Sequence, residues 1–152
     1  MTFAQPGNVS LVGHSLGGGM ASAASGAGGI PAQTFNAAGL SRATLDDLPY
    51  KRRSLVQSTH VRGDILSGLQ DLTPGTPNAY GTRRGLDPAR SLTWGDVKAG
   101  ALGARVAGPI GAGAAALGAR GVRLHSMDSV MAALDAERED IEDRRQREGC
   151  DG

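Results

Sequence analysis

A serine between glycines near the start of the chain has the clearest potential for chemistry. The segment Gly13-His14-Ser15-Leu16-Gly17 matches the G-x-S-x-G pattern, in which a serine lies on a sharp turn between a strand and a helix. Small residues on both sides of such a turn let the chain pass closely behind the serine. The pattern predicts that Ser15 is a nucleophile and that the backbone N–H of Leu16 points at the oxyanion formed during attack on a carbonyl.

The pattern alone is weak evidence, because a chain with 24 glycines among 152 residues matches it by chance fairly often. Its context favours a nucleophile, since a β-type run at 9–12 precedes it and a helix-compatible, small-residue stretch at 16–25 follows. The alternative is a glycine-rich turn with an ordinary serine. A phosphate-binding loop is disfavoured, because no Lys-Ser or Lys-Thr stands at P-loop spacing and no G-x-G-x-x-G falls between Gly13 and Gly19.

A serine hydroxyl needs a base, and the chain has three histidines. His14 lies inside the turn, on the wrong side to deprotonate its neighbour, and we expect it to be structural. His60 falls within an expected strand, where a packed or exposed histidine is the ordinary explanation. His125 lies between a glycine-rich segment and the last helix, where an imidazole can reach the end of another strand. We therefore predict that His125 is the general base, with a capping or surface histidine as the alternative.

The candidate for the acid that orients this base is Asp64. It follows the third expected strand directly, at the carboxyl edge where catalytic loops of open parallel sheets gather. The alternative is an aspartate that caps the turn after the strand. The other aspartates considered lie in a helical stretch or deeper in loops: Asp46, Asp47, Asp71 and Asp87.

Strands and helices alternate around these residues, which suggests parallel βαβ packing and an α/β fold with a parallel sheet flanked by helices. The expected strands cover 9–12, 32–37 and 54–61, and the expected helices cover 16–25 and 42–48, the second capped by Ser41.

The second half of the chain has weaker signals. Residues 73–95, rich in Pro, Gly, Asn and Arg, are expected to form a long surface loop, and 99–121 form either a loosely packed helix pair or a mobile flap. A last helix is expected after an N-cap at Ser126, with apolar residues at helical spacing and almost only charges beyond Asp135. We expect a hydrolase-like domain at 1–135, with the flap or loop at 73–121, and a charged helical tail at 136–152.

Composition restricts the classes of partner and compartment. A net charge of +1 implies no general attraction to nucleic acid, and the single cysteine, Cys150, argues against a disulfide framework or a cysteine-based metal site. The first residues lack the pattern of a signal peptide, so we expect none, and Arg105, Pro109 and Arg120 interrupt the closest candidate for a membrane span. These features predict a protein that is cytoplasmic or secreted by a signal-independent route.

The residues resemble the class 3 (fungal-type) lipases and the related bacterial phospholipases and effector lipases, within the α/β-hydrolase superfamily. Residues 9–18 look like the lipase serine signature, and 34–39 are similar to the strand and turn that follow it. Residues 61–66 resemble the acid-bearing segment, and 125–128 resemble the histidine-bearing segment. The resemblance implies a triad of Ser15, Asp64 and His125 that hydrolyses carboxylic esters of lipids through an acyl-enzyme, with no metal or cofactor.

The resemblance also has consequences for partners. In the family several strands precede the serine strand, whereas eight residues precede Val9, so we expect a partial α/β-hydrolase without its N-terminal strands. An exposed sheet edge would then favour self-association or pairing with a missing N-terminal segment. The Ala-, Gly- and Arg-rich composition is similar to bacterial proteins in which such domains end secreted toxins, and a toxin would have an inhibitor or immunity protein.

Two alternatives to a lipid esterase remain from the sequence. An acyltransferase or thioesterase could use the same serine turn. A non-catalytic lipase remnant could act as an interaction domain through its charged C-terminal helix. The region at 73–121 has no counterpart in the family, which leaves the lid and the acyl-chain pocket without assigned residues.

Overall fold

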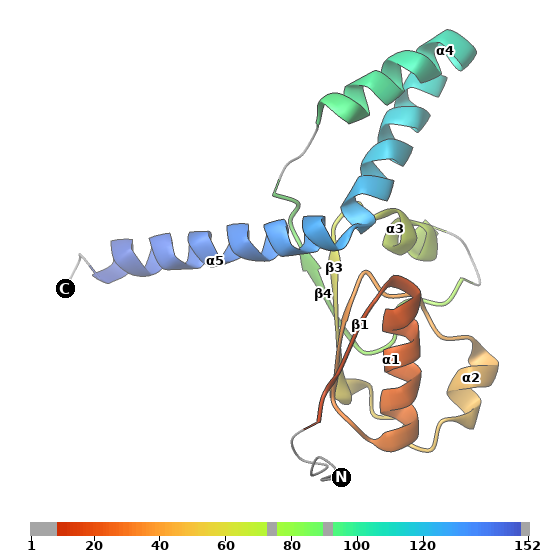
Figure 1. Ribbon diagram of the computed structural model, residues 1–152, viewed down its shortest axis with the longest axis vertical. Helices are drawn as coiled ribbons and strands as arrows, with labels where there is room; N and C mark the ends of the chain where they lie inside the picture. Colours follow the sequence, from red (N-terminus) through yellow and green to blue (C-terminus); the bar gives the residue numbers. More distant parts are fainter. Residues whose placement is uncertain (1–8, 73–75, 90–92, 150–152) are drawn as a thin grey trace, which may run out of the picture.

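The computed structural model describes residues 9–72, 76–89 and 93–149, which contain a four-stranded parallel sheet. Its strands lie in the order of the sequence: β1 (Leu11–His14), β2 (Ala32–Phe35), β3 (Val56–Val61) and β4 (Thr82–Leu86). Each connection runs through a helix (Figure 1): α1 (Ser15–Gly28), α2 (Arg42–Asp47) and α3 (Ile65–Leu72). A short 3-10 helix, η2 (Arg53–Leu55), leads into β3. The predicted α/β class, with a parallel sheet flanked by helices, is confirmed.

Helix α1 packs closely on the sheet because its buried face consists of small residues. Gly18, Gly19, Ala21, Ser22 and Ser25 are all buried there. Gly29 caps the end of the helix, and its left-handed backbone (φ 67°) lets its N–H reach the carbonyl of Ser25. A helix of larger residues would sit farther from the sheet and would carry the residues at its start away from the strand ends.

The two faces of the sheet bury separate apolar clusters. Side chains alternate between the faces along each strand, so the residues of one strand divide between the two clusters. The cluster beneath α1 and α2 contains Ala32, Leu40, Leu48, Val56 and Tyr80. The cluster on the other face contains Val61, Leu86, Leu124, Val130 and Ala133.

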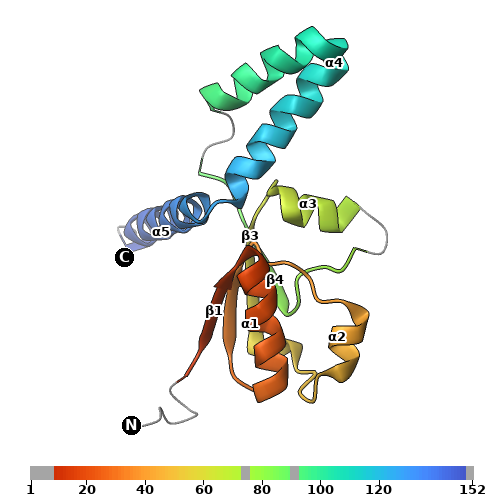
Figure 2. The same ribbon diagram turned by 45° about the vertical axis from the view of Figure 1, so that its right-hand side comes forward.

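The second cluster joins the carboxyl end of the sheet to two long helices, α4 (Trp94–His125) and α5 (Met127–Gly149). Both helices project from the end of the sheet in different directions (Figures 1 and 2). Helix α4 folds back on itself, because Ala107 and Gly108 leave helical geometry and Gly108 has a φ of 62°. Of the two alternatives for 99–121, the structure has the helix pair.

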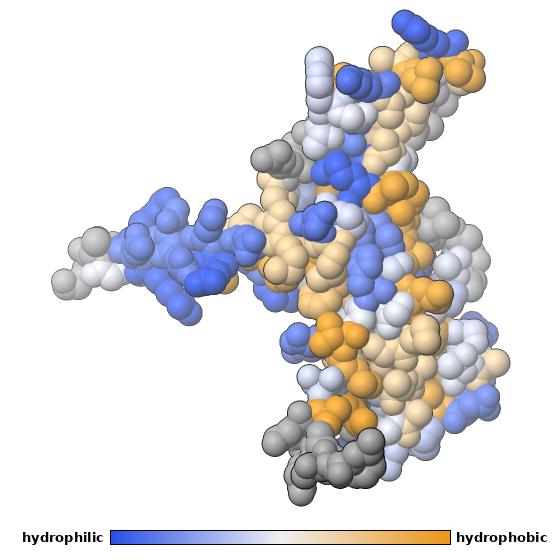
Figure 3. Space-filling model, in the orientation of Figure 1, coloured by the Kyte–Doolittle hydropathy of each residue, from blue (hydrophilic) through white to orange (hydrophobic). Residues whose placement is uncertain are grey.

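Helix α5 begins at the predicted N-cap, because the N–H of Ser129 donates to the Ser126 hydroxyl at 3.2 Å. The outer part of α5 is almost entirely hydrophilic (Figure 3). Ion pairs between Asp140 and Arg144 (2.6 Å) and between Asp143 and Arg147 (4.0 Å) follow the i,i+4 spacing of its charges. None of the described helices is long and apolar enough to cross a membrane.

The prediction of an unbroken surface loop over 73–95 is wrong, because β4 lies inside it and α4 begins at Trp94. Residues 73–75 and 90–92 lie outside the described residues. Strand β4 is an edge strand whose sequence, Thr-Arg-Arg-Gly-Leu, lacks the apolar alternation by which strands are recognised. Strand β4 is held in place by backbone pairing with β3. Backbone pairing does not depend on the side chains, so it produces no recognisable pattern in the sequence.

Candidate active site

The turn that carries Ser15 has the strand–turn–helix setting that the sequence predicted. Strand β1 ends at His14 and α1 starts at Ser15, whose φ of 55° places a non-glycine residue in the left-handed region. Residue 13 must be a glycine in this turn, because a Cβ on Gly13 would lie 2.3 Å from the carbonyl oxygen of Gly17. The backbone therefore projects Ser15 from the end of the sheet, with the first N–H groups of α1 beside it.

Of the three residues predicted as a triad, His125 lies in contact with both Ser15 and Asp64. The Nε2 atom of His125 is 2.8 Å from the Oγ atom of Ser15, and its Nδ1 atom is 2.6 Å from Oδ1 of Asp64. An ionised carboxylate only accepts hydrogen bonds, so Nδ1 of His125 carries the proton when it faces ionised Asp64. The lone pair of Nε2 then points at Ser15 and can accept the proton of its hydroxyl.

Asp64 has two structural tasks at once. Its side chain is fully buried, and its second oxygen, Oδ2, accepts a hydrogen bond from the N–H of Ser67 at 2.8 Å. This contact makes Asp64 the N-cap of α3. The alternative from the sequence was a cap on the turn after the strand, whereas Asp64 caps α3 and also contacts His125, because each carboxylate oxygen has its own partner.

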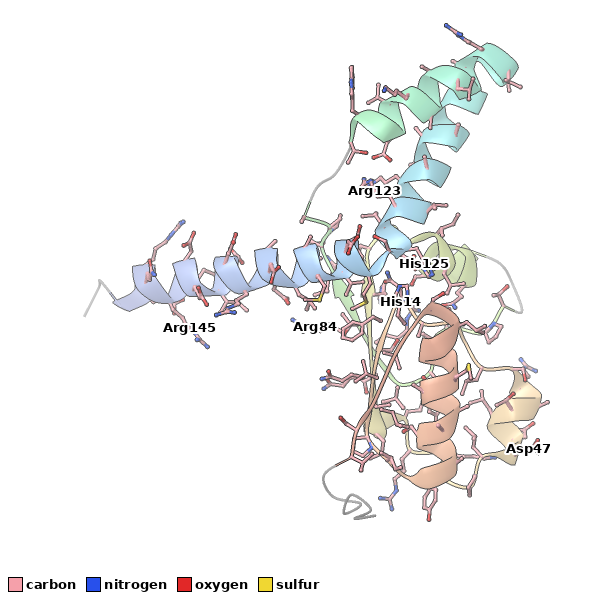
Figure 4. All side chains as sticks on the ribbon, viewed as in Figure 1. His14, Asp47, Arg84, Arg123, His125 and Arg145 are labelled. Atoms are coloured by element: carbon pink, nitrogen blue, oxygen red, sulfur yellow. The ribbon has the colours of Figure 1, made fainter. Side chains whose placement is uncertain are left out.

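The three residues come from three elements that end at the same edge of the sheet. Ser15 follows β1, Asp64 follows β3, and His125 is the last residue of α4. His14 and His125 meet where α4 ends (Figure 4), with their ring centroids 5.1 Å apart. The carboxyl edge of a parallel sheet is the usual place for a functional site, and this arrangement follows that rule.

Two further residues contact the backbone at His125. His14 was expected to be structural, and its Nε2 atom lies 2.7 Å from the carbonyl oxygen of His125. Asn36, for which the sequence suggested no role, donates from Nδ2 to the carbonyls of Leu124 (3.0 Å) and His125 (3.2 Å). The signal that could have identified Asn36 is an amide side chain placed directly after a buried strand, at the same edge as the predicted triad.

Comparison with known families identifies the chain as a phospholipase domain. The chain matches the family described as "Phospholipase-like: Tle-like phospholipase domain" over residues 3–131. The chain belongs to this family. No curated protein matches the chain at a significant level. The protein is therefore a lipid hydrolase of the phospholipase type.

The match to the phospholipase domain spans the whole candidate site. It includes Ser15, Asp64 and His125, and it ends at Met131 in the second turn of α5. The charged remainder of α5 lies beyond the matched region. The site and the family match thus fall in the same part of the chain.

An ion pair holds together the two ends of α4, where the helix pair meets the rest of the phospholipase domain. The Arg123 guanidinium donates to Oδ2 of buried Asp96 at 2.8 Å, and the N–H of Thr93 donates to the same oxygen at 2.8 Å. The hydrogen bond from Arg123 is the largest influence on Asp96 and holds its pKa below the ordinary value, while burial acts in the opposite direction. This contact joins the start of α4 to its last turn, two residues before His125.

The remaining candidates from the sequence lie apart from this cluster. His60 is within β3, and Asp87 forms an ion pair with Arg62 at 2.6 Å. The other three aspartates lie in helices: Asp46 and Asp47 in α2, and Asp71 in α3. In the described ranges, no three His, Cys, Asp or Glu side chains come together in a group that could hold a metal ion.

Proposed function

We propose that this phospholipase domain hydrolyses carboxylic esters of lipids by nucleophilic catalysis at Ser15. The observation that carries the proposal is the continuous contact from Ser15 Oγ through the His125 imidazole to Asp64, with separations of 2.8 and 2.6 Å. A hydroxyl becomes an effective nucleophile when a base accepts its proton and a third group orients that base.

In the proposed mechanism, Ser15 Oγ attacks the acyl carbonyl of the lipid while His125 Nε2 accepts the hydroxyl proton. The backbone N–H of Leu16, at the start of α1, donates to the oxyanion, and the positive end of the helix adds to this stabilisation. His125 then gives its proton to the oxygen of the leaving alcohol, which departs and leaves an acyl-enzyme on Ser15. Water attacks this ester by the same steps in reverse order and releases the fatty acid.

In this mechanism Asp64 accepts the hydrogen bond from Nδ1–H of His125 throughout the cycle. It holds the imidazole in the tautomer that presents Nε2 to Ser15, and it stabilises the imidazolium that forms after proton transfer. Because Asp64 is fully buried and also caps α3, its carboxylate has a fixed position relative to the end of β3. The acid is thus held in place before substrate binds.

The resemblance of the serine, acid and histidine segments to class 3 lipases supports placement in the α/β-hydrolase superfamily. The order Ser15, Asp64, His125 along the chain is the order found in that superfamily. Together with the family match, it supports a bacterial effector phospholipase, for which the substrate is a membrane phospholipid and an immunity protein is the expected partner.

The test is labelling of the purified chain with a fluorophosphonate, which reacts with activated serines, beside hydrolysis of a short-chain ester and of phospholipid vesicles. We expect Ser15→Ala to lose labelling entirely and His125→Ala to keep only a low residual labelling rate, with ester hydrolysis reduced on the order of 10⁴-fold or more for the serine variant. Ser10→Ala is the matched control, because Ser10 is an exposed serine directly before the same strand, β1, and this variant should label like the wild type.

The possible outcomes of these assays lead to different conclusions. A folded wild-type chain that does not label would contradict the proposal and favour a lipase remnant that acts as an interaction domain. Labelling with transfer of the acyl group to an added alcohol or thiol, in place of water, would indicate an acyltransferase on the same serine turn. Release of free fatty acid from phospholipid that depends on Ser15 supports the hydrolase.

A further inference from the structure

We infer that Asn36 is a positioning residue for the proposed reaction: with His14, it holds the backbone of His125 so that the imidazole stays between Ser15 and Asp64. The inference rests on the proposed function, because it takes His125 as the base. It adds a requirement that the triad alone does not contain, namely a side chain that holds two triad-bearing segments together.

The first step concerns the end of α4. The last carbonyls of a helix have no partner within the helix and need donors from elsewhere. Here Asn36 Nδ2 donates to the carbonyls of Leu124 (3.0 Å) and His125 (3.2 Å). His14 Nε2 lies 2.7 Å from the same His125 carbonyl, which only accepts, so this nitrogen carries a proton. Two side chains at the ends of β1 and β2 therefore hold the residue that bears the base.

The second step concerns the other contacts of Asn36. Its Oδ1 accepts a hydrogen bond from the N–H of Val61 at 2.9 Å, and the carbonyl of Val61 in turn accepts from the N–H of Asp64 at 3.0 Å. The backbone N–H of Asn36 donates to the carbonyl of Thr59, also in β3, at 2.9 Å. One buried amide thus connects the end of β3, which carries the acid, with the end of α4, which carries the base.

The third step connects the nucleophile. His14 directly precedes Ser15, and the N–H of Ala38, two residues after Asn36, donates to the Ser15 carbonyl at 2.9 Å. The segment that starts at Asn36 therefore contacts all three chain segments of the site. Because the segments are far apart in sequence, contacts of this kind help to fix their relative positions.

The position requires asparagine for two physical reasons. Asn36 has a φ of 43°, and asparagine enters the left-handed region more readily than other residues with a side chain. Its amide also supplies a donor to the carbonyls of α4 and an acceptor to Val61, a combination that the carboxylate of aspartate cannot supply. A shift of about 1 Å in a catalytic group can lower the rate about 100-fold, so loss of this donor should be visible in the kinetics.

The experiment compares Asn36→Asp, Asn36→Gly and Thr34→Val in the full chain. Asn36→Asp keeps the shape and loses the donor, and Asn36→Gly loses the whole side chain while it relieves the left-handed backbone. Thr34→Val is the matched control, because Thr34 is equally buried two residues earlier and its hydroxyl has no hydrogen-bond partner among the described atoms. We expect the fluorophosphonate labelling rate to fall about 100-fold in both Asn36 variants and to stay within a few-fold of wild type in the control.

A double-mutant cycle separates positioning from general damage. If Asn36 acts through His125, then Asn36→Asp should lower the residual rate no further in a His125→Ala background. A further drop of the same size in that background would show that the substitution disturbs the site by another route, and it would overturn the inference.

A second readout does not depend on activity. The short contact between His125 Nδ1 and Asp64 predicts a downfield proton resonance from the imidazole in the NMR spectrum, which Asp64→Asn should remove and thereby assign. We expect the resonance in wild type and Thr34→Val, and its loss or shift in both Asn36 variants. If these variants fold, keep the resonance unchanged and label normally, the inference is wrong. If wild type shows the resonance but never labels, the proposed function fails, and the resonance in the Asn36 variants alone decides the role of Asn36.

Discussion

The Nε2 atom of His125 lies 2.8 Å from the Oγ atom of Ser15, although the two residues are 110 positions apart in the chain. The contact joins the start of α1 to the end of α4 at the carboxyl edge of the sheet. It depends on the apolar cluster around Leu124 and on the contacts of Asn36 and His14, which together place the last turn of α4.

The two tasks of Asp64 can be separated by substitution. Asp64→Asn retains an oxygen that can accept from Ser67, so α3 keeps its cap, but the amide no longer fixes the imidazole tautomer. We expect kcat for ester hydrolysis to fall about 10⁴-fold with little change in stability. Asp64→Ala should lose activity in the same way and also lose about 0.5–2 kcal/mol of unfolding free energy with the cap. Equal stability of the two variants in a urea titration would show that the cap contributes nothing.

The two glycines that flank Ser15 should differ in their tolerance of a side chain. A Cβ at Gly13 would lie 2.3 Å from the Gly17 carbonyl oxygen, whereas a Cβ at Gly17 meets nothing within 4 Å. Gly13→Ala should therefore destabilise the fold by about 1–3 kcal/mol and abolish labelling. Gly17→Ala, on an open side of α1, should fold at least as well as wild type, because alanine favours a helix over glycine. Thermal unfolding of the pair measures the difference, and equal melting temperatures would argue against the tight turn.

The apolar cluster beneath α5 should stabilise the position of the base. Leu124 is 1% exposed and packs in the cluster with Val61, Leu86 and Val130. Leu124→Ala should lower the unfolding free energy by about 2–5 kcal/mol, measured by chemical denaturation. Leu102→Ala is the control on the same helix, because Leu102 is 65% exposed, and it should change stability by less than about 0.5 kcal/mol. Similar losses in the two variants would mean that the outer part of α4 is also packed.

The ion pair at the base of α4 should give a pH-dependent contribution to stability. The Arg123 guanidinium lowers the pKa of Asp96 below its ordinary value of 3.8, so the ionised form is favoured in the folded protein. The contribution is complete above pH 3.8 and is lost as the pH falls through the lower pKa of the folded state. Asp96→Asn should therefore lower the melting temperature at pH 7, and its difference from wild type should shrink below about pH 4.

Asp87→Asn provides the comparison for this pH series. Asp87 pairs with Arg62 at the surface, where its side chain is 82% exposed, so its removal should change stability by about 0–1 kcal/mol. A gap between wild type and Asp96→Asn that stays constant from about pH 7 to about pH 3 would contradict the role given to the Asp96 charge.

Local patterns in the sequence were sufficient for several parts of the structure. The strand–turn–helix around Ser15, the caps at Ser41 and Ser126, and the parallel α/β class follow from short-range signals such as glycine spacing, hydroxyl caps and alternation. The same signals predicted Asp64 and His125 as candidates, because each lies at the end of an expected element.

Short-range signals in the sequence were enough to identify the residue types that could do chemistry and the short elements that carry them, since backbone preferences and capping act within a few residues. The tertiary structure was needed to show that Ser15, Asp64 and His125 meet, that Asn36 contacts the backbone of the base, and that β4 forms a strand. These features depend on contacts between segments far apart in the chain, and such contacts are set by the packing of the whole fold and leave no periodic pattern in the residues that make them.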